Sequence, residues 1–406
     1  MHNRHDSAHN NGDGFLNNLI FGDDSAENNA ASFTNNTVIG NNSAQSNGEN
    51  FNDNTVIGNG SANGGGSNVT NNIVIGDNSG NEYADDAASN YVFGNNSGNE
   101  VDGVSNNAFG TNVGNNVGSD NNTAMGVDSG NNVAGDNNTA IGVDSGNDVT
   151  GFGNQASGFV TGNGVFGFFN QASGAFSGNA VAGFNNQASG FGSGNFVAGA
   201  NNIASGFNAG NGVVGFNNIA IGSGAGNGIG FESNTIAMGT NTVVTQSGGV
   251  AIGGDSFGNG ATSTLTNQFV LGTVNHTYTA PGITSDLSRQ RQSGPLELVT
   301  SDAAGNLATD GGALFEQVDE NTAGIALAIA MENPDLVTDE NFGIAAHWGY
   351  FDGANAASIA GQAVIARNAF MAGDRIAASA SVGMGFEHGN ADTTWGVRAG
   401  GQYTWK

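Results

Sequence analysis

The chain lacks several residue types, and each shortage excludes a class of protein. It has no cysteine, which excludes a disulfide scaffold and a thiolate metal site. Only 7 Lys and Arg stand against 35 Asp and Glu, and no Lys or Arg lies between Arg4 and Arg289. Binding to nucleic acid or to anionic lipid needs Lys or Arg to neutralise phosphates, so we expect neither partner.

Long apolar runs are also missing. No run approaches the roughly 18 apolar residues of a membrane-spanning helix. Residues 1–14 are polar and lack the apolar segment of a signal peptide. If the protein is exported, the sequence is truncated or its start is misplaced. The 70 glycines and abundant Asn leave too few apolar residues for a large conventional core, which is typical of repeats.

Glycines recur at regular intervals between residues 17 and 272, each at the end of a short motif such as Asn-Thr-Val-Ile-Gly. The first five are 18 residues apart and the next eight follow at intervals of 16. They are Gly22, Gly40, Gly58, Gly76 and Gly94, then Gly110, Gly126, Gly142, Gly158, Gly174, Gly190, Gly206 and Gly222. Two short strands per repeat, each ended by a glycine that allows a tight corner, predict a β-solenoid or β-roll coil. Stacked coils then share one continuous core.

The faces of the repeat strands change in the middle of this region. Thr37 and Ile39 lie on one face of a repeat strand and Val38 on the other. In the middle repeats, Gln-Ala-Ser replaces this triplet, beginning at Gln155. Phenylalanines occur instead at Phe168, Phe184, Phe207 and Phe216, so we expect the apolar contribution to shift to those positions. Stacked Gln and Asn side chains are expected to form hydrogen-bonded ladders.

The repeats stop at Gly272. Residues 273–311 are interpreted as a neck, with a strand and turn expected at 276–282. A helix is predicted over 312–334, ended by Asn333-Pro334. Its apolar residues have the 4-3-4-3 spacing of a coiled-coil seam, in which Asn321 is a polar register-setter. The predicted seam is Leu314, Val318, Asn321, Ile325 and Ala328.

Residues 335–406 contain short runs with alternating faces, which is typical of β-strands. One face carries large apolar groups: Phe342, Ile344, Trp348, Tyr350, Ile376, Val382, Met384, Phe386, Trp395, Val397, Tyr403 and Trp405. The other carries small or polar groups: Gly343, His347, Gly383, Gly385, Glu387, Gly396, Arg398 and Gly400. Runs of about 10 residues with terminal aromatics suit a transmembrane β-strand. The small residues indicate that something packs closely on their face, where a soluble meander would have a normal solvent face.

Four strands cannot close a barrel, and open edges do not survive in lipid. Several chains must therefore contribute. Two chains would give eight strands around an interior already filled by side chains. Three chains would give twelve strands, with room for three helices, and we predict this homotrimeric barrel.

The helix, the four strands and the aromatic near the C-terminus resemble the membrane anchor of trimeric autotransporter adhesins, the YadA-like family. The glycine-ended repeat resembles that family's head repeat, a left-handed parallel β-roll, although Thr often replaces Val and the spacing is longer. The resemblance implies a homotrimer in the outer membrane. It also implies insertion by the barrel-assembly machinery, export of the head by the anchor, and attachment to host matrix, cells or another surface. Lys406 departs from the family's terminal aromatic, and the family often places Asn, as at Asn321, around a bound anion.

The resulting prediction is a mainly all-β chain with five parts. These are a disordered tail (1–16), a β-roll head (17–272), a neck (273–311), a coiled-coil helix (312–334) and a membrane anchor of β-strands (335–406). The predicted function is a surface adhesin. The alternatives are a phage-type trimeric fibre, or an ice-binding solenoid that displays Thr once per coil. Gln replaces Thr mid-chain, which speaks against a continuous ice-binding plane.

The remaining motifs carry little chemistry. A G-x-G-x-x-G match begins at Gly162, but glycine is so frequent here that repetition explains it. Asp128 and Asp144 recur once per coil, where Asx turns are a simpler interpretation than Ca²⁺ ligands. The tail histidines His2, His5 and His9 are weak metal candidates, and Glu387 and Arg398 are expected to pair or to line the barrel. We find no nucleophile–base pair, and expect no enzyme activity, catalytic residue, metal or cofactor.

Overall fold

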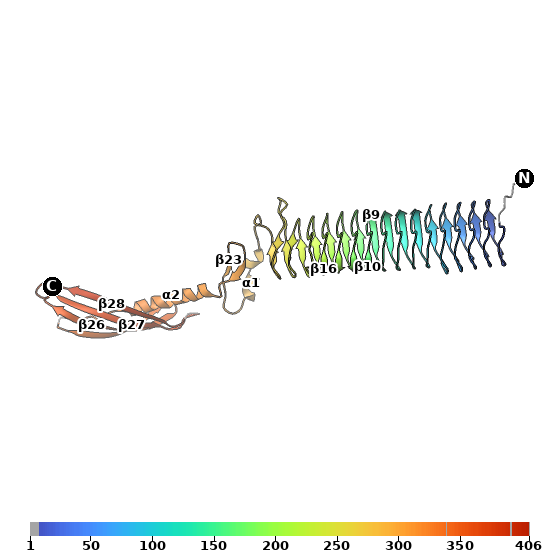
Figure 1. Ribbon diagram of the computed structural model, residues 1–406. Coiled ribbons are helices and arrows are strands. Elements are labelled where there is room, and N and C mark those ends of the chain that lie inside the picture. Colours follow the sequence, from blue (N-terminus) through green and yellow to red (C-terminus); the bar gives the residue numbers. More distant parts are fainter. Residues whose placement is uncertain (1–7, 338, 390–391, 406) are drawn as a thin grey trace. The chain divides into compact units, whose positions relative to one another are not determined.

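The computed structural model describes residues 8–337, 339–389 and 392–405. The chain forms two compact units, one up to Thr277 and the other from Tyr278 onward, and each is described by itself (Figure 1). Both are mainly β-structure, as predicted. None of the helices within the described residues has the length and apolar character that a membrane crossing requires.

The first unit is a parallel β-solenoid, which confirms the predicted repeat architecture. Its main sheet has 16 strands, and neighbouring strands pair in parallel with equivalent repeat residues opposite one another (Figure 1). The strands are β1 (Leu19–Phe21), β2 (Thr37–Ile39), β3 (Thr55–Ile57), β4 (Ile73–Ile75), β5 (Tyr91–Phe93), β6 (Asn107–Thr111), β7 (Thr123–Val127), β8 (Thr139–Val143), β9 (Gln155–Phe159), β11 (Gln171–Ser173), β13 (Gln187–Ser189), β15 (Ile203–Ser205), β17 (Ile219–Ile221), β18 (Ile236–Met238), β20 (Val250–Ile252) and β22 (Phe269–Leu271).

Shorter pairings complete the coils. The second sheet consists of β10 (Phe166–Phe168), β12 (Ala182–Phe184), β14 (Ala198–Ala200) and β16 (Val214–Phe216), and a pair is formed by β19 (Val243–Val244) and β21 (Thr262–Ser263). Glycine is required where coils stack tightly: Gly40 has φ 145°, and a Cβ there would lie 1.9 Å from the carbonyl oxygen of Gly58. The solenoid begins before residue 17, because the N–H of Gly12 donates to the carbonyl of Asn29 and Leu16 pairs with Thr34.

The interior of the solenoid is narrow and is filled mainly by Val and Ala, with the rings of Phe33, Phe51 and Tyr83 in the first coils. The middle residues of the strands point inward, so Val38 is fully buried and Ala140 is 4% exposed. The first and third residues of each strand, such as Thr37 and Ile39, point outward. The expected shift of the core to phenylalanine is wrong. The four phenylalanines named for that role, Phe168, Phe184, Phe207 and Phe216, are 44–55% exposed, whereas Phe33 and Phe51 in the longer 18-residue coils are buried.

A ladder of buried asparagines runs through the solenoid, as predicted. The side-chain Oδ1 of each accepts a hydrogen bond from the backbone N–H of the next, one coil further along. The members are Asn36, Asn54, Asn72, Asn90, Asn106, Asn122, Asn138, Asn154, Asn170, Asn186, Asn202 and Asn218. The ladder satisfies polar groups that the thin coil removes from water.

The second unit begins with small elements and continues into a helix and a sheet. The elements are η1 (Pro281–Thr284), α1 (Asp286–Arg291), β23 (Val299–Ser301), β24 (Leu307–Thr309), α2 (Ala313–Ala330), β25 (Phe342–Phe351), β26 (Ala354–Arg367), β27 (Arg375–Gly385) and β28 (Thr394–Thr404). The strand expected at 276–282 is absent, because Pro281 starts a short 3-10 helix instead. The helix α2 ends at Ala330, four residues before the predicted end.

Strands β25 to β28 form an antiparallel sheet in sequence order, and α2 lies along one face of it (Figure 1). The alternation predicted for β25 and β27 is present. Ile344 and Val382 are exposed on the outer face, whereas Gly349 and Gly383 are buried on the face that meets α2. Strand β26, whose faces the sequence does not define, directs Ser358 and Gln362 inward. Its register with β27 shifts between Val364 and Ala366.

Candidate functional surfaces

The outward face of the long sheet is free of charge over all 16 strands. Every first and third strand residue is partly or fully exposed, and none of them is Asp, Glu, Lys, Arg or His. Many are large and apolar, such as Ile39, Met125 and Leu271, which are 38, 45 and 51% exposed. In a chain with a net charge of −28, this face is where like-charged copies can meet without charge repulsion.

Polar residues interrupt this face in the middle of the solenoid. The outward positions of β9, β11 and β13 are Gln and Ser, and the Gln residues pair in register, with Gln155 opposite Gln171 and Gln171 opposite Gln187. Apolar residues return in β17, where Ile219 and Ile221 occupy the same positions. The face therefore has apolar ends and a polar centre.

Helix α2 has two apolar faces. Ala323, Ala326, Leu327 and Ala330 are buried, with Leu327 lying over Gly383 and Gly396 of the sheet. The five predicted seam residues are all exposed: Leu314, Val318, Asn321, Ile325 and Ala328. At about 100° per residue, the seam is centred roughly opposite the buried face. One face thus binds the chain's own sheet, and the second is left without a covering in this chain.

Most of the residues predicted for the inner face of the strands lie against α2 or the segment after it. A Cβ on Gly349 would lie 2.1 Å from the carbonyl oxygen of Ala326, and one on Gly383 would lie 2.6 Å from Cδ1 of Leu327. Equivalent atoms on Gly343, Gly385 and Gly396 would meet Leu336, Ala323 and Leu327, whereas one on Gly400 would meet Ser379 of the sheet. The small residues therefore make room for the helix, which is the close packing that the sequence predicts.

The expected pairing of Glu387 with Arg398 is wrong. Glu387 lies two residues beyond the end of β27 and is exposed, whereas Nη1 of Arg398 donates to the carbonyl oxygen of Met331 at 2.6 Å. His347 does lie on the inner face, with Nε2 3.8 Å from a carboxylate oxygen of Glu332.

Sequence reasoning missed a group of arginines that holds the segment after α2. Arg367 donates to the carbonyl oxygen of Glu340 at 2.7 Å, and Arg375 donates to those of Leu336 and Val337 at 3.1 and 3.2 Å. Arg398 binds the start of the same segment, as described above. Three of the seven Lys and Arg residues thus donate hydrogen bonds to backbone carbonyls of this segment. The scarcity of Lys and Arg in the chain was the signal that could have drawn attention to these arginines.

The outer face of the C-terminal sheet is apolar. Of the twelve residues predicted for it, nine are exposed, among them Val397 at 84% and Trp395 at 71%, and Ile376, Met384 and Phe386 are partly buried. Aromatic rings gather near both ends of the strands. Trp348 lies 5.3 Å from Phe386 near one end, and Tyr403 lies 5.3 Å from Trp405 near the other. Phe386 and Trp405 are just beyond the ends of β27 and β28.

Carboxylates organise the turns around these elements. Asp255 and Asp302 each begin an Asp-x-x-Gly-Asn turn, in which the Asn side chain donates to the carboxylate at 2.9 Å. This hydrogen bond is the largest cause that holds both pKa values below their usual range. Asp310 accepts the N–H groups of Gly312 and Leu314 at the start of α2, and these bonds and one from Leu298 lower its pKa.

The interior of the coils does not support a small-molecule site. The space inside the coils is about 40 Å³, which is room for a few waters at most. The described residues contain no cluster of three His, Asp or Glu that could hold a metal. Asp128 and Asp144 have φ of 51 and 53° and accept hydrogen bonds from Asn112 and Asn147, which suits turns. His2 and His5 lie outside the described residues. No protein-family model, curated protein sequence or solved structure matches the chain.

Proposed function

We propose that the protein is a homotrimeric surface adhesin, anchored in an outer membrane by a twelve-stranded barrel to which each chain gives β25 to β28. The observation that carries the proposal is the double-faced helix α2. Its buried face binds the chain's own sheet, and its opposite apolar seam suits two further copies of the same helix. Three helices inside one barrel would cover all three seams and leave the outer apolar faces toward lipid.

The solenoid supports the same assembly. Its long sheet presents an uncharged and largely apolar face, which suits contact with the equivalent face of other copies. The acidic residues lie elsewhere on the coils, so a trimer built through this face keeps them apart in water. The exposed remainder of the solenoid would then be the head that contacts another surface. This head would bind by a distributed surface, because the coils enclose no pocket of useful size.

The outer face of β25 to β28 favours the adhesin over a fibre. By the register of the sheet, the outward residues of these four strands carry no charge. A shaft that stands in water would expose charged or polar groups there. The polar Gln and Ser centre of the long sheet interrupts the regular Thr array that an ice-binding solenoid needs.

Two measurements on the full chain test the proposal. The first is the number of subunits after folding in detergent, by light scattering with the detergent mass subtracted. We expect a trimer that resists dissociation on heating. The second is cleavage of the solenoid by protease added to intact cells that produce the chain behind an export signal. A soluble monomer, or a solenoid protected from protease in intact cells, would contradict the proposal.

A further inference from the structure

The middle of the solenoid contains a long segment without charge. Residues 149–231 include no Asp, Glu, Lys, Arg or His, although the whole chain has 35 acidic residues. The same 83 residues contain 12 of the 25 phenylalanines. Acidic residues flank the segment closely, with Asp148 before it and Glu232 after it. The composition therefore changes sharply along a repeat whose backbone hardly changes.

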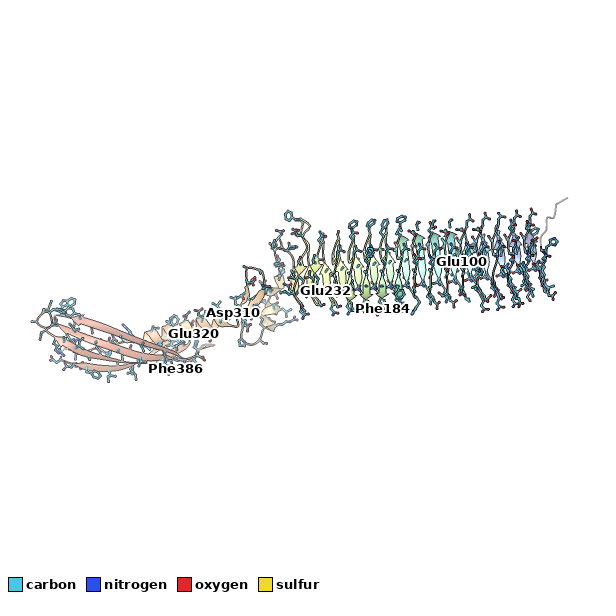
Figure 2. All side chains as sticks on the ribbon, viewed as in Figure 1. Glu100, Phe184, Glu232, Asp310, Glu320 and Phe386 are labelled. Atoms are coloured by element: carbon cyan, nitrogen blue, oxygen red, sulfur yellow. The ribbon has the colours of Figure 1, made fainter. Side chains whose placement is uncertain are left out.

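Nearly all of these phenylalanines are on the surface. Eleven of them, from Phe152 to Phe216, are 40–71% exposed, and we call them the phenylalanine band. They are Phe152, Phe159, Phe166, Phe168, Phe169, Phe176, Phe184, Phe191, Phe196, Phe207 and Phe216. Figure 2 labels Phe184, whose side chain points out from the solenoid on the side of β10 and β16. The free energy that burial of these rings would contribute is not used within the chain.

In the coils of the band, the outward residues of the long sheet are mainly polar and those of the second sheet are apolar. In β9, β11 and β13 the first and third residues, which point outward, are Gln and Ser, and β9 ends on the exposed Phe159. Across the same coils the second sheet directs only apolar groups outward, in two columns. One column is Phe166, Ala182, Ala198 and Val214. In the other, Phe168, Phe184 and Phe216 are exposed, whereas Ala200, between the last two, is buried. The second sheet therefore carries apolar residues where the long sheet carries Gln and Ser, and other rings of the band, from Phe159 in β9 to Phe207, lie outside the second sheet.

We propose that the phenylalanine band is the adhesive contact of the head, and that it binds an uncharged, apolar solid surface. This inference rests on the proposed adhesive function and names the class of surface. An uncharged patch offers no partner to a charged ligand, and the acidic coils on both sides would repel an anionic one. Exposed apolar patches of this kind mark interaction sites, and contact with an apolar solid removes the rings from water without leaving a polar group unpaired.

The ring geometry distinguishes a flat apolar contact from stacking of a sugar or a base. Such ligands need the open face of an aromatic ring. Along one edge of the band, Phe191 and Phe207 are stacked on each other at 5.4 Å with 9° between their planes. Phe159, Phe176 and Phe191 meet edge to face at 5.3 and 5.4 Å. Several ring faces along this edge are thus covered by neighbouring rings.

Backbone hydrogen bonds between coils hold the residues that carry these rings in place. Phe166 donates its N–H to Val181, and Phe168 accepts from the N–H of Asn185. Because the backbone is already ordered, binding to a surface costs mainly side-chain conformational entropy. The register also offers a conservative substitution. Ala182 is the neighbour of Phe166 in the sheet, and Ala200 lies between Phe184 and Phe216, so alanine already fits these positions.

The test compares attachment of cells that display the full chain to silica beads with methyl-terminated or hydroxyl-terminated coatings. The band variant combines Phe166→Ala, Phe168→Ala, Phe184→Ala and Phe216→Ala. The matched control is Phe257→Ala, because Phe257 is 80% exposed but lies in a loop outside the band. We expect the band variant to lose about tenfold or more in retention on methyl beads, since four phenylalanine rings lose their contact with the coating. The control and the subunit number should not change.

Three results would overturn the inference. They are unchanged retention of the band variant, equal retention of the unmodified chain on both coatings, and a change in subunit number, which would make the band a contact between chains. Failure of the proposed function is recognised separately, by protease protection of the solenoid on intact cells. If the chain is then recovered in soluble form, adsorption of the purified full chain to the same two coatings decides the role of the band.

Discussion

The side-chain Oδ1 of Asn138 accepts two hydrogen bonds from Asn154, one coil further along the solenoid. The backbone N–H donates at 3.0 Å and Nδ2 at 3.1 Å. Both side chains are buried, with exposures of 5 and 4%. The pair therefore joins two coils through buried polar groups, in an interior that is too narrow to hold a water molecule at every coil. The same relationship recurs along most of the first unit, so coil stacking depends on asparagine as much as on apolar contact.

Replacement of Asn154 by alanine should destabilise the solenoid by about 2–4 kcal/mol. The change removes the Nδ2 bond to the carbonyl of Gly167 at 2.8 Å and leaves the backbone N–H of Asn170 without its acceptor, and a buried unsatisfied group costs about 1–3 kcal/mol. Thermal unfolding followed by far-ultraviolet circular dichroism measures the loss. Thr150→Ala is the control, because Thr150 is exposed and pairs with Ala134 and should change stability by less than about 0.5 kcal/mol. Equal losses would argue against the role of the ladder.

Two glycines of neighbouring coils should respond very differently to alanine. Gly130 has φ 65°, and a Cβ there would lie 2.5 Å from Cβ of Ala124. Gly130→Ala therefore combines an unfavourable backbone conformation with overpacking and should cost about 2–4 kcal/mol. At Gly118 the nearest atom to an added Cβ is 3.9 Å away and the backbone is ordinary, so Gly118→Ala should be neutral within about 0.5 kcal/mol. Calorimetry of the two variants gives the comparison, and similar melting temperatures would contradict this packing.

The architecture could be predicted from the sequence because both units have a regular spacing of residue types. Glycines at 18- and then 16-residue intervals specify coils, and the alternation in 342–350 and 376–386 specifies strands whichever face is buried. The polar composition of residues 8–16 predicts a disordered tail, yet these residues form part of the first coil. Their polar composition was misleading, because in this fold a stretch gains its stability from the neighbouring coil more than from its own apolar residues.

The core was harder to predict, for a physical reason. Large apolar residues such as Ile141 and Phe184 normally indicate the buried side of a strand. In a thin coil the order reverses: Ala140 fits inside, and Ile141 must point out. In the 16-residue coils that carry the phenylalanine band, Val and Ala occupy the buried positions, whereas Phe33 and Phe51 are buried in the 18-residue coils. The arginine contacts after α2 could not be predicted, since their acceptors are backbone carbonyls that carry no sequence signal.

The close approach of α2 to its sheet should fail when Gly349 is enlarged. A Cβ on Gly349 would overlap the carbonyl oxygen of Ala326 and also lie 2.8 Å from the backbone nitrogen of Ala330. Gly349→Val should therefore displace the helix and destabilise the second unit by about 3 kcal/mol or more. All three Trp residues lie in this unit, so Trp fluorescence follows its unfolding separately from the solenoid. Gly361→Val is the control, since its nearest atom is 4.0 Å away, and a loss as large as that of Gly349→Val would be inconsistent with the helix contact.

Acid should loosen the turn that closes the end of the solenoid. Hydrogen bonds from the side chains of Asn259 and then Asn275 lower the pKa of Asp255 below its unfolded value of about 4. A depressed carboxyl pKa stabilises the fold above the unfolded pKa, and this contribution is lost as pH falls toward the folded pKa. Hydrogen exchange of residues 255–260, normalised for intrinsic rates, should therefore accelerate below about pH 4. Asp255→Asn should exchange fast at all pH values, and persistent acid sensitivity in that variant would assign the effect elsewhere.

The exposed seam of α2 should be essential for assembly but not for the fold of one chain. Ile325 is 43% exposed and lies on the side of the helix opposite Leu327, so Ile325→Asp adds no charge to the contact between α2 and its own sheet. In a trimer the same change would place three carboxylates close together in a region with little water, and the cost of several kcal/mol should abolish the heat-resistant trimer. Glu316→Gln, on the exposed first turn of α2 and away from the seam, should leave it intact. Subunit counts in detergent at pH 7 decide the matter, and partial recovery of the trimer near pH 4, where carboxylates protonate, would identify charge as the cause. A trimer that survives Ile325→Asp at neutral pH would mean that the helices do not meet along this seam.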